Sequence, residues 1–205
     1  MKLENDYLKD IQEIRSMMER SSKFLSLSGL SGVMAGIYAL LAAYIAKNTF
    51  QFNPQEFGYS TNNIFSLGIL GCITLLISIS TAILLSYRKA NKKNESIWNH
   101  IAKRMALSMI IPLGVGGVFI LICILKQYHG LIIPSSLFFY GLSLVNASNF
   151  TYADVRSLGI LQIILGLLSA YFTEYSLLMW SLGFGIIHII YGIYIYYKYE
   201  IETNN

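Results

Sequence analysis

The sequence predicts an all-α membrane protein: a polytopic bundle of six transmembrane helices with an N-terminal amphipathic helix on the cytoplasmic side. Of its 205 residues, 55% are hydrophobic and only 13% are charged, which is too little polar surface for a soluble domain of this size. A helix needs about 20 mostly apolar residues to cross the hydrocarbon core of a bilayer. Six stretches come close to that length and make one membrane domain, residues 24–197: they are residues 24–46, 64–87, 105–125, 131–147, 155–172 and 176–197.

The segment ahead of the first span, residues 1–23, is predicted to be a charged helix with an apolar stripe. Five acidic residues balance five basic ones in this segment, whereas a helix that lies on anionic lipid carries mostly Lys and Arg on its polar face. We therefore expect residues 1–23 to contact protein in preference to the lipid surface. The contact would be with the ends of the bundle, a second copy of the chain or a cytoplasmic partner. The stripe, at helical spacing, consists of Tyr7, Ile11, Ile14 and Met18.

Lys and Arg are distributed unevenly between the two ends of the spans. Positive charges near span ends stay on the cytoplasmic side of a membrane. With the N-terminus inside, 13 of the 15 basic residues are cytoplasmic, and only Lys47 and Lys126 lie outside. The sequence therefore predicts that both termini are cytoplasmic and that residues 198–205 form a cytoplasmic tail. The net charge of +4 is then mostly a consequence of this topology and does not indicate nucleic-acid binding. We expect the protein to bind no nucleic acid and to lie in the lipid bilayer.

The connections between the spans contain residues that are typical of membrane interfaces and helix ends. Residues 47–63 are rich in aromatic side chains, which favour the level of the lipid headgroups. Residues 88–104 form a long basic connection, which topology and attraction to anionic lipid are sufficient to explain. Asp154 precedes the fifth span and is placed to cap that helix.

Three spans share one spacing of glycine and polar residues. On a helix these offsets place all three positions of a span on one face. In lipid, a face of small residues around a polar group allows helices to approach closely. The sequence therefore marks the flanking glycines as helix-packing residues. The three motifs are Gly29-x-x-Gly32-x-x-x-Gly36, Gly159-x-x-Gln162-x-x-x-Gly166 and Gly185-x-x-His188-x-x-x-Gly192.

The central residues of these motifs, Gly32, Gln162 and His188, are candidates for a polar layer inside the membrane. At a rise of about 1.5 Å per residue, all three are expected roughly 10–14 Å from the cytoplasmic boundary. His188 and Gln162 could then form a hydrogen bond across adjacent antiparallel helices, with room left by Gly32. Ionisable residues inside spans are functional candidates, but a proton relay normally needs a carboxylate, and the six predicted cores contain no Asp or Glu. A packing histidine is the favoured interpretation, and a site in a transport path is the alternative.

Two stretches of the chain, residues 14–24, which run into residues 28–32, and residues 182–192, are distinctive. They resemble segments of an uncharacterised family of six-span bacterial inner-membrane proteins. The resemblance implies a bacterial origin, a location in the cytoplasmic membrane and the six-span topology. It implies no chemistry.

The sequence contains no catalytic, metal or nucleotide motif that rises above chance, so we expect no enzymatic activity and no cofactor. A haem held by two histidines of one chain is excluded, because His100 and His129 lie outside the predicted cores. The leading hypothesis is a non-enzymatic membrane scaffold or sensor that contacts a partner through its cytoplasmic face. The alternative is a small-solute or proton-linked transporter or channel that uses the His188 and Gln162 layer.

Overall fold

The computed structural model describes residues 23–50, 61–92, 96 and 98–201. The predicted N-terminal helix therefore lies outside the described residues, apart from Lys23. Most of the connection predicted at 47–63 and the end of the predicted tail also lie outside them.

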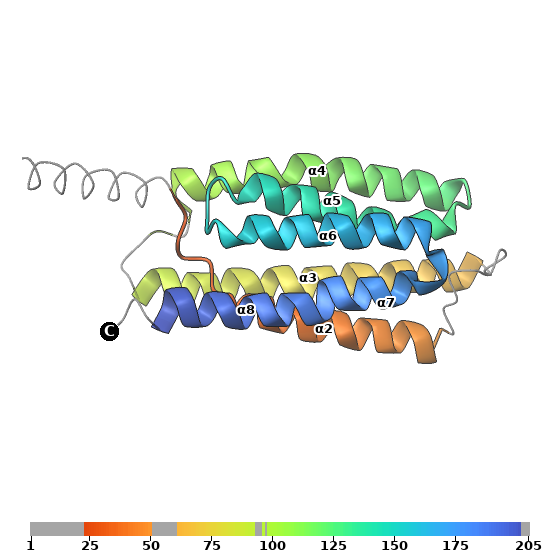
Figure 1. Ribbon diagram of the computed structural model, residues 1–205, viewed down its shortest axis with the longest axis horizontal. Coiled ribbons are helices and arrows are strands. Elements are labelled where there is room, and N and C mark those ends of the chain that lie inside the picture. Colours follow the sequence, from red (N-terminus) through yellow and green to blue (C-terminus); the bar gives the residue numbers. More distant parts are fainter. Residues whose placement is uncertain (1–22, 51–60, 93–95, 97, 202–205) are drawn as a thin grey trace, which may run out of the picture.

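All regular structure in the described residues is helical (Figure 1). Within the described residues, six helical stretches are long and apolar enough to cross a membrane, so the prediction of an all-helical fold with six membrane-length helices is confirmed. The first five spans are formed by α2 (Gly29–Asn48), α3 (Thr61–Lys92), α4 (His100–Leu125), η1 (His129–Leu131) with α5 (Ile132–Ala147), and α6 (Asp154–Tyr171). The sixth consists of η2 (Thr173–Tyr175), α7 (Ser176–Trp180), η3 (Ser181–Ile187), α8 (His188–Tyr196) and η4 (Tyr197–Ile201).

Several helix ends differ from those read from hydropathy. The first span begins at Gly29 and not at residue 24, because residues 24–28 are not helical and bond to other parts of the bundle. Much of the basic connection at 88–104 is helical, since α3 continues to Lys92 and α4 begins at His100. The side chain of Asn99 accepts a hydrogen bond from Ala102 N and so caps α4. Hydropathy marks where a helix enters lipid, whereas hydrogen bonds and caps decide where it ends.

Asp154 does not cap α6 as predicted. The helix shows no side-chain cap at its N-terminus, and the carboxylate instead accepts hydrogen bonds from Lys198 Nζ at 3.0 Å and from Tyr199 OH at 2.7 Å. Residues 198–201, the start of the predicted tail, are helical as part of η4 (Tyr197–Ile201). The Lys198–Asp154 ion pair therefore ties the end of the last span to the start of the fifth.

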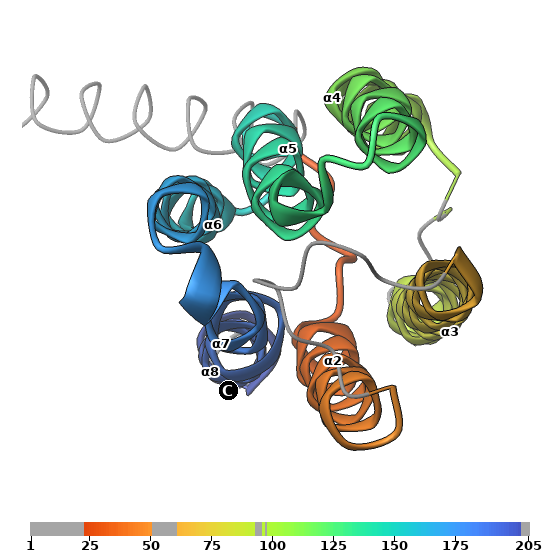
Figure 2. The same ribbon diagram turned by 90° about the vertical axis from the view of Figure 1, so that its right-hand side faces the viewer.

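The six spans form two layers of three (Figures 1 and 2). In one layer α5 lies between α4 and α6, and in the other α2 lies between α3 and the sixth span. The layers pack against each other mainly along α6 and the sixth span. At the opposite edge, α3 packs beside α2 and stands apart from α4 (Figure 2). The layers are thus joined along one edge, and we call the other edge, where α3 and α4 are not closely packed, the open edge.

Glycines allow the backbones within each layer to come close. A Cβ at Gly192 would lie 2.5 Å from Val33 N, and one at Gly29 would lie 2.5 Å from Tyr196 N. A Cβ at Gly36 would lie 2.6 Å from Gly185 O. The marked faces of the first and last spans therefore lie directly against each other.

The motif face of the fifth span packs elsewhere. A Cβ at Gly159 would lie 2.7 Å from Gly141 O, and one at Gly166 would lie 2.9 Å from Phe138 N. Both neighbours belong to α5, the helix that precedes α6 in the chain and in its layer. The glycines of the three motifs therefore form two separate contacts, one in each layer.

Candidate functional site

His188 lies buried at the junction of the two layers, at the start of α8. The preceding seven residues, Ser181–Ile187, form a π-helix, a widened helical turn that is often found at functional positions. Within this turn, the carbonyl oxygen of Gly183 lies 2.7 Å from Nδ1 of His188. The wide turn thus places a backbone acceptor beside the imidazole.

The hydrogen-bond partners of His188 define its tautomer. A carbonyl oxygen can only accept, so Nδ1 carries the proton that it donates to Gly183 O. In the neutral ring, Nε2 is then an acceptor, and Tyr140 OH lies 3.0 Å from it and donates. Both ring nitrogens of neutral His188 are therefore satisfied.

Aromatic rings hold the imidazole on its faces. Phe184 is stacked on His188 with ring centroids 5.8 Å apart, and Tyr140 is tilted against it at 5.5 Å. Trp180 continues the cluster beyond Phe184 at 5.1 Å. These contacts fix the plane of the histidine ring in addition to its hydrogen bonds.

Gln162 is fully buried on α6 and shares the same carbonyl acceptor. Its Nε2 donates to Gly183 O at 2.7 Å and lies 3.3 Å from His188 Nδ1. Since both of these nitrogens carry protons in this arrangement, the Gly183 carbonyl links the two residues, and the direct bond expected from the sequence is replaced by a shared acceptor. The structure does bring Gln162 and His188 together across α6 and the last span.

The other end of the Gln162 amide has no partner. Its Oε1 is buried and finds no hydrogen-bond donor among the described residues. A Cβ at Gly183 would lie 2.6 Å from this oxygen, 2.8 Å from the Leu137 side chain and 3.2 Å from that of Leu165, so the amide oxygen sits in apolar surroundings. Burying an acceptor without a donor lowers the stability of a protein by about 1–3 kcal/mol. The packing of the layer gives no structural reason for this cost.

Gly32, the third candidate of the predicted layer, does not reach the imidazole. A Cβ there would lie 3.2 Å from Gly192 Cα and 3.4 Å from His188 O. Gly32 therefore contacts the backbone of α8, where it sets the spacing between helices. Among the described residues, no three His, Cys, Asp or Glu side chains are placed to hold a metal ion.

A second polar cluster lies at the end of the bundle where the first span begins. Residues 23–28, which we call the strap, cross from one layer to the other ahead of α2 (Figures 1 and 2). Phe24 N donates to Phe150 O at 2.7 Å, and Thr151 Oγ1 donates to Phe24 O at 2.8 Å. Tyr152 OH donates to Leu25 O. The first half of the strap is thus bound to the connection between α5 and α6.

The second half of the strap is bound to α3. Lys89 Nζ donates to Leu27 O at 2.7 Å, and Ser28 N donates to Ser86 Oγ at 3.3 Å. Lys89 also pairs with Glu200 Oε1 at 3.2 Å, with side chains 9% and 15% exposed. The same Glu200 oxygen accepts from Gly29 N at 2.6 Å, so the carboxylate caps the N-terminus of α2 from another helix.

Sequence reasoning missed Tyr140, Gly183, Lys89 and Glu200. Tyr140 offered one signal, because a tyrosine in the middle of an apolar span needs a partner for its hydroxyl. Lys89 was read as one member of a basic connection, yet it is buried at the end of α3 beside Ser86 and Ala90. No local signal distinguishes it from its exposed neighbours, because its acceptors come from distant parts of the chain.

No family model, curated protein or solved structure matches this chain. The fold itself defines the class: an all-helical bundle with six helices long and apolar enough to cross a membrane. Its buried polar features include the His188 layer and the strap with the Lys89–Glu200 ion pair.

Proposed function

We propose that the protein is a non-enzymatic membrane scaffold or sensor, in which a partner of the N-terminal segment is coupled to the helical bundle through the strap. One observation carries this proposal. The strap directly follows residues 1–22 in the chain and is hydrogen-bonded to both layers of the bundle. A force or constraint on the N-terminal segment therefore acts on both layers at once.

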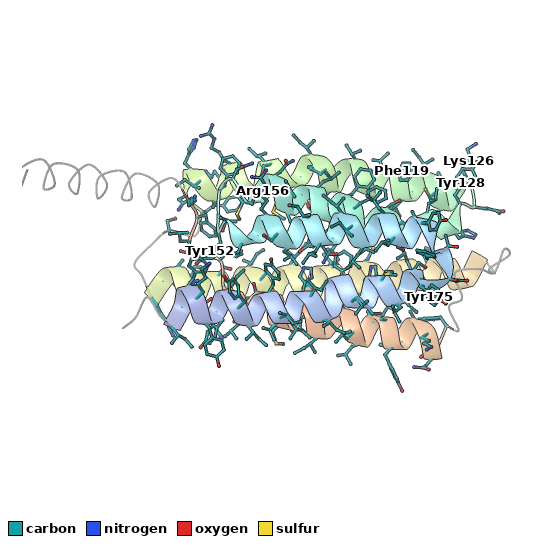
Figure 3. The ribbon with its side chains drawn as sticks, in the orientation of Figure 1. Phe119, Lys126, Tyr128, Tyr152, Arg156 and Tyr175 are labelled. Atoms are coloured by element: carbon teal, nitrogen blue, oxygen red, sulfur yellow. The ribbon has the colours of Figure 1, made fainter. Side chains whose placement is uncertain are left out.

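The distribution of charge supports a cytoplasmic location for the strap end. Tyr152 and Arg156 lie at this end of the bundle, whereas Lys126, Tyr128 and Tyr175 lie at the other (Figure 3). The basic residues of α3 and α4 that flank residues 93–99 also belong to the strap end. Basic residues favour the cytoplasmic side and aromatic residues favour the headgroup level. The proposal places both termini in the cytoplasm of a bacterial cell and the bundle in its inner membrane.

Association through the N-terminal segment is tested by replacing residues 2–20 with a flexible Gly/Ser segment of equal length. We expect the bundle to remain folded in detergent, with a changed oligomeric state measured by native mass spectrometry or with loss of a co-purifying partner. A matched control exchanges Glu13 and Arg15 with each other, which keeps the apolar stripe and the charge balance. The scaffold proposal fails if the replaced and the original proteins form the same complexes.

The second candidate function is a small-solute or proton-linked transporter or channel. Oε1 of Gln162 favours it: no donor among the described residues reaches this atom, and a buried acceptor beside His188 offers a place for a donor to bind. Against it, both nitrogens of His188 are already hydrogen-bonded. Hydrogen–deuterium exchange at the C2 position of the imidazole separates the two functions. Slow exchange without a titration step supports a packing role, and rapid exchange that titrates supports transport.

A further inference from the structure

The strap joins parts of the bundle that otherwise lie apart. The two layers pack against each other mainly along α6 and the sixth span, and α3 stands apart from α4 at the opposite edge. The strap spans the space between the layers at one end of this arrangement (Figure 2). Its carbonyl oxygens bond to residues 151 and 152 in one layer and to residue 89 in the other. A short segment of chain thus bridges the two layers at that end.

Lys89 is the centre of this bridge. An ammonium group has three N–H donors, and three acceptors from different elements lie within reach of its Nζ. They are Leu27 O of the strap at 2.7 Å, Tyr152 OH at 3.1 Å and Glu200 Oε1 at 3.2 Å. Tyr152 passes the connection on to the strap by donating to Leu25 O. One charged group therefore links the strap, the α5–α6 connection of the α4–α5–α6 layer and the end of the sixth span.

We propose that the Lys89–Glu200 ion pair is a latch: it holds the strap between the two layers, and when the pair is broken the strap leaves and α3 and α4 move apart at that end. The proposal goes beyond the proposed function, because it concerns the isolated chain and needs no partner. Removing one member of a buried pair leaves the other charge uncompensated and strongly favours exposure to water. Water can reach the latch, because the latch lies at the end of the spans.

The released groups can be satisfied at that position. The strap carbonyls and the N-terminal N–H groups of α2 require partners when they leave their sites, and water at the membrane surface supplies them. The glycine contacts of Gly29, Gly32 and Gly36 with the last span lie within one layer. They do not depend on the separation of the layers, so each layer moves as a unit about the edge formed by α6 and the sixth span.

Distances between spin labels at the two ends of the open edge test the latch. One pair replaces Tyr87 of α3 and Leu107 of α4 at the strap end, and the other replaces Phe65 and Leu125 at the far end; all four side chains are exposed. The two native cysteines are first removed by the substitutions Cys72→Ser and Cys123→Ala, and the protein is studied in lipid nanodiscs. With Lys89→Met we expect the 87–107 distance distribution to shift to longer values and the 65–125 distribution to stay unchanged.

The matched control is Lys198→Met, which breaks the neighbouring Lys198–Asp154 ion pair at the same end without touching the strap. We expect it to leave both distance distributions unchanged. A milder variant, Glu200→Gln, keeps an oxygen acceptor for Gly29 N and removes only the charge. It is expected to shift the 87–107 distances to longer values as well. It is also expected to raise the rate at which a maleimide reagent labels a Leu25→Cys variant, because Leu25 is half-buried in the strap.

The latch is overturned if the 87–107 distances do not change in Lys89→Met and Glu200→Gln. It is also overturned if both ends shift equally, because that result describes general loosening of the bundle. If Lys89→Met does not fold, the 87–107 and 65–125 distance distributions of Glu200→Gln test the latch in its place. An unchanged oligomeric state after replacement of residues 2–20 bears on the scaffold proposal alone and leaves this one standing.

Discussion

Substitution of Gly192 by alanine is expected to push α2 and α8 apart. The new Cβ would lie 2.5 Å from Val33 N and 2.7 Å from Gly29 O, and both are backbone atoms that cannot move without moving the helix. Ordinary contact begins at 3.4 Å, so the helices must separate by about 1 Å at this point. A gap of that size forfeits roughly a quarter to a half of the attraction between facing atoms.

The change in the free energy of unfolding caused by Gly192→Ala is the sum of two opposing effects. Overpacking of a close contact costs about 1–3 kcal/mol, whereas alanine in place of glycine within a helix gains about 0.5–1 kcal/mol. The control Gly71→Ala isolates the gain, because nothing lies within 4 Å of a Cβ at that position on α3. The free energy of unfolding should therefore be lower for Gly192→Ala than for Gly71→Ala by about 1–3 kcal/mol.

A third variant, Gly185→Ala, tests whether a clash with a side chain costs less than a clash with the backbone. A Cβ at Gly185 would meet the side chain of Leu40, which can adopt another rotamer. Gly185→Ala should therefore cost less than Gly192→Ala, although both glycines belong to the same motif. Unfolding by SDS titration in mixed micelles, followed by tryptophan fluorescence, measures all three. Equal stability of Gly192→Ala and Gly71→Ala would refute the backbone contact between α2 and α8.

Two further predictions concern the polar layer and the topology. His188→Gln should be tolerated, because an amide can donate to Gly183 O and accept from Tyr140 OH, whereas His188→Leu should lower the free energy of unfolding by on the order of 1 kcal/mol through the unpaired hydroxyl; equal melting temperatures of the two variants would contradict the network. Reporter fusions at Asn205 and within residues 88–104 should report the cytoplasm and a fusion at Gln55 the outside, and a periplasmic signal at Asn205 would rule out the proposed orientation.

The sequence by itself determined the class of fold. In lipid, a backbone can satisfy its hydrogen bonds only within a helix or a closed barrel, and apolar stretches of membrane length predict the helical choice from local composition alone. The six stretches therefore needed no knowledge of their neighbours. The marked glycines were also readable, because helical spacing fixes which residues share a face.

The tertiary structure alone decided which faces meet and which groups pair. The glycines of the first span lie against those of the last, whereas those of the fifth lie against α5, and helical spacing is the same in both cases. Tyr140 reaches His188 across 48 positions of the chain, and Gly29 N reaches Glu200 across 171. Hydropathy does not encode the rotation or the order of helices around the bundle. For that reason the partner of His188, the strap and the buried Lys89–Glu200 pair emerge only when the layers are assembled.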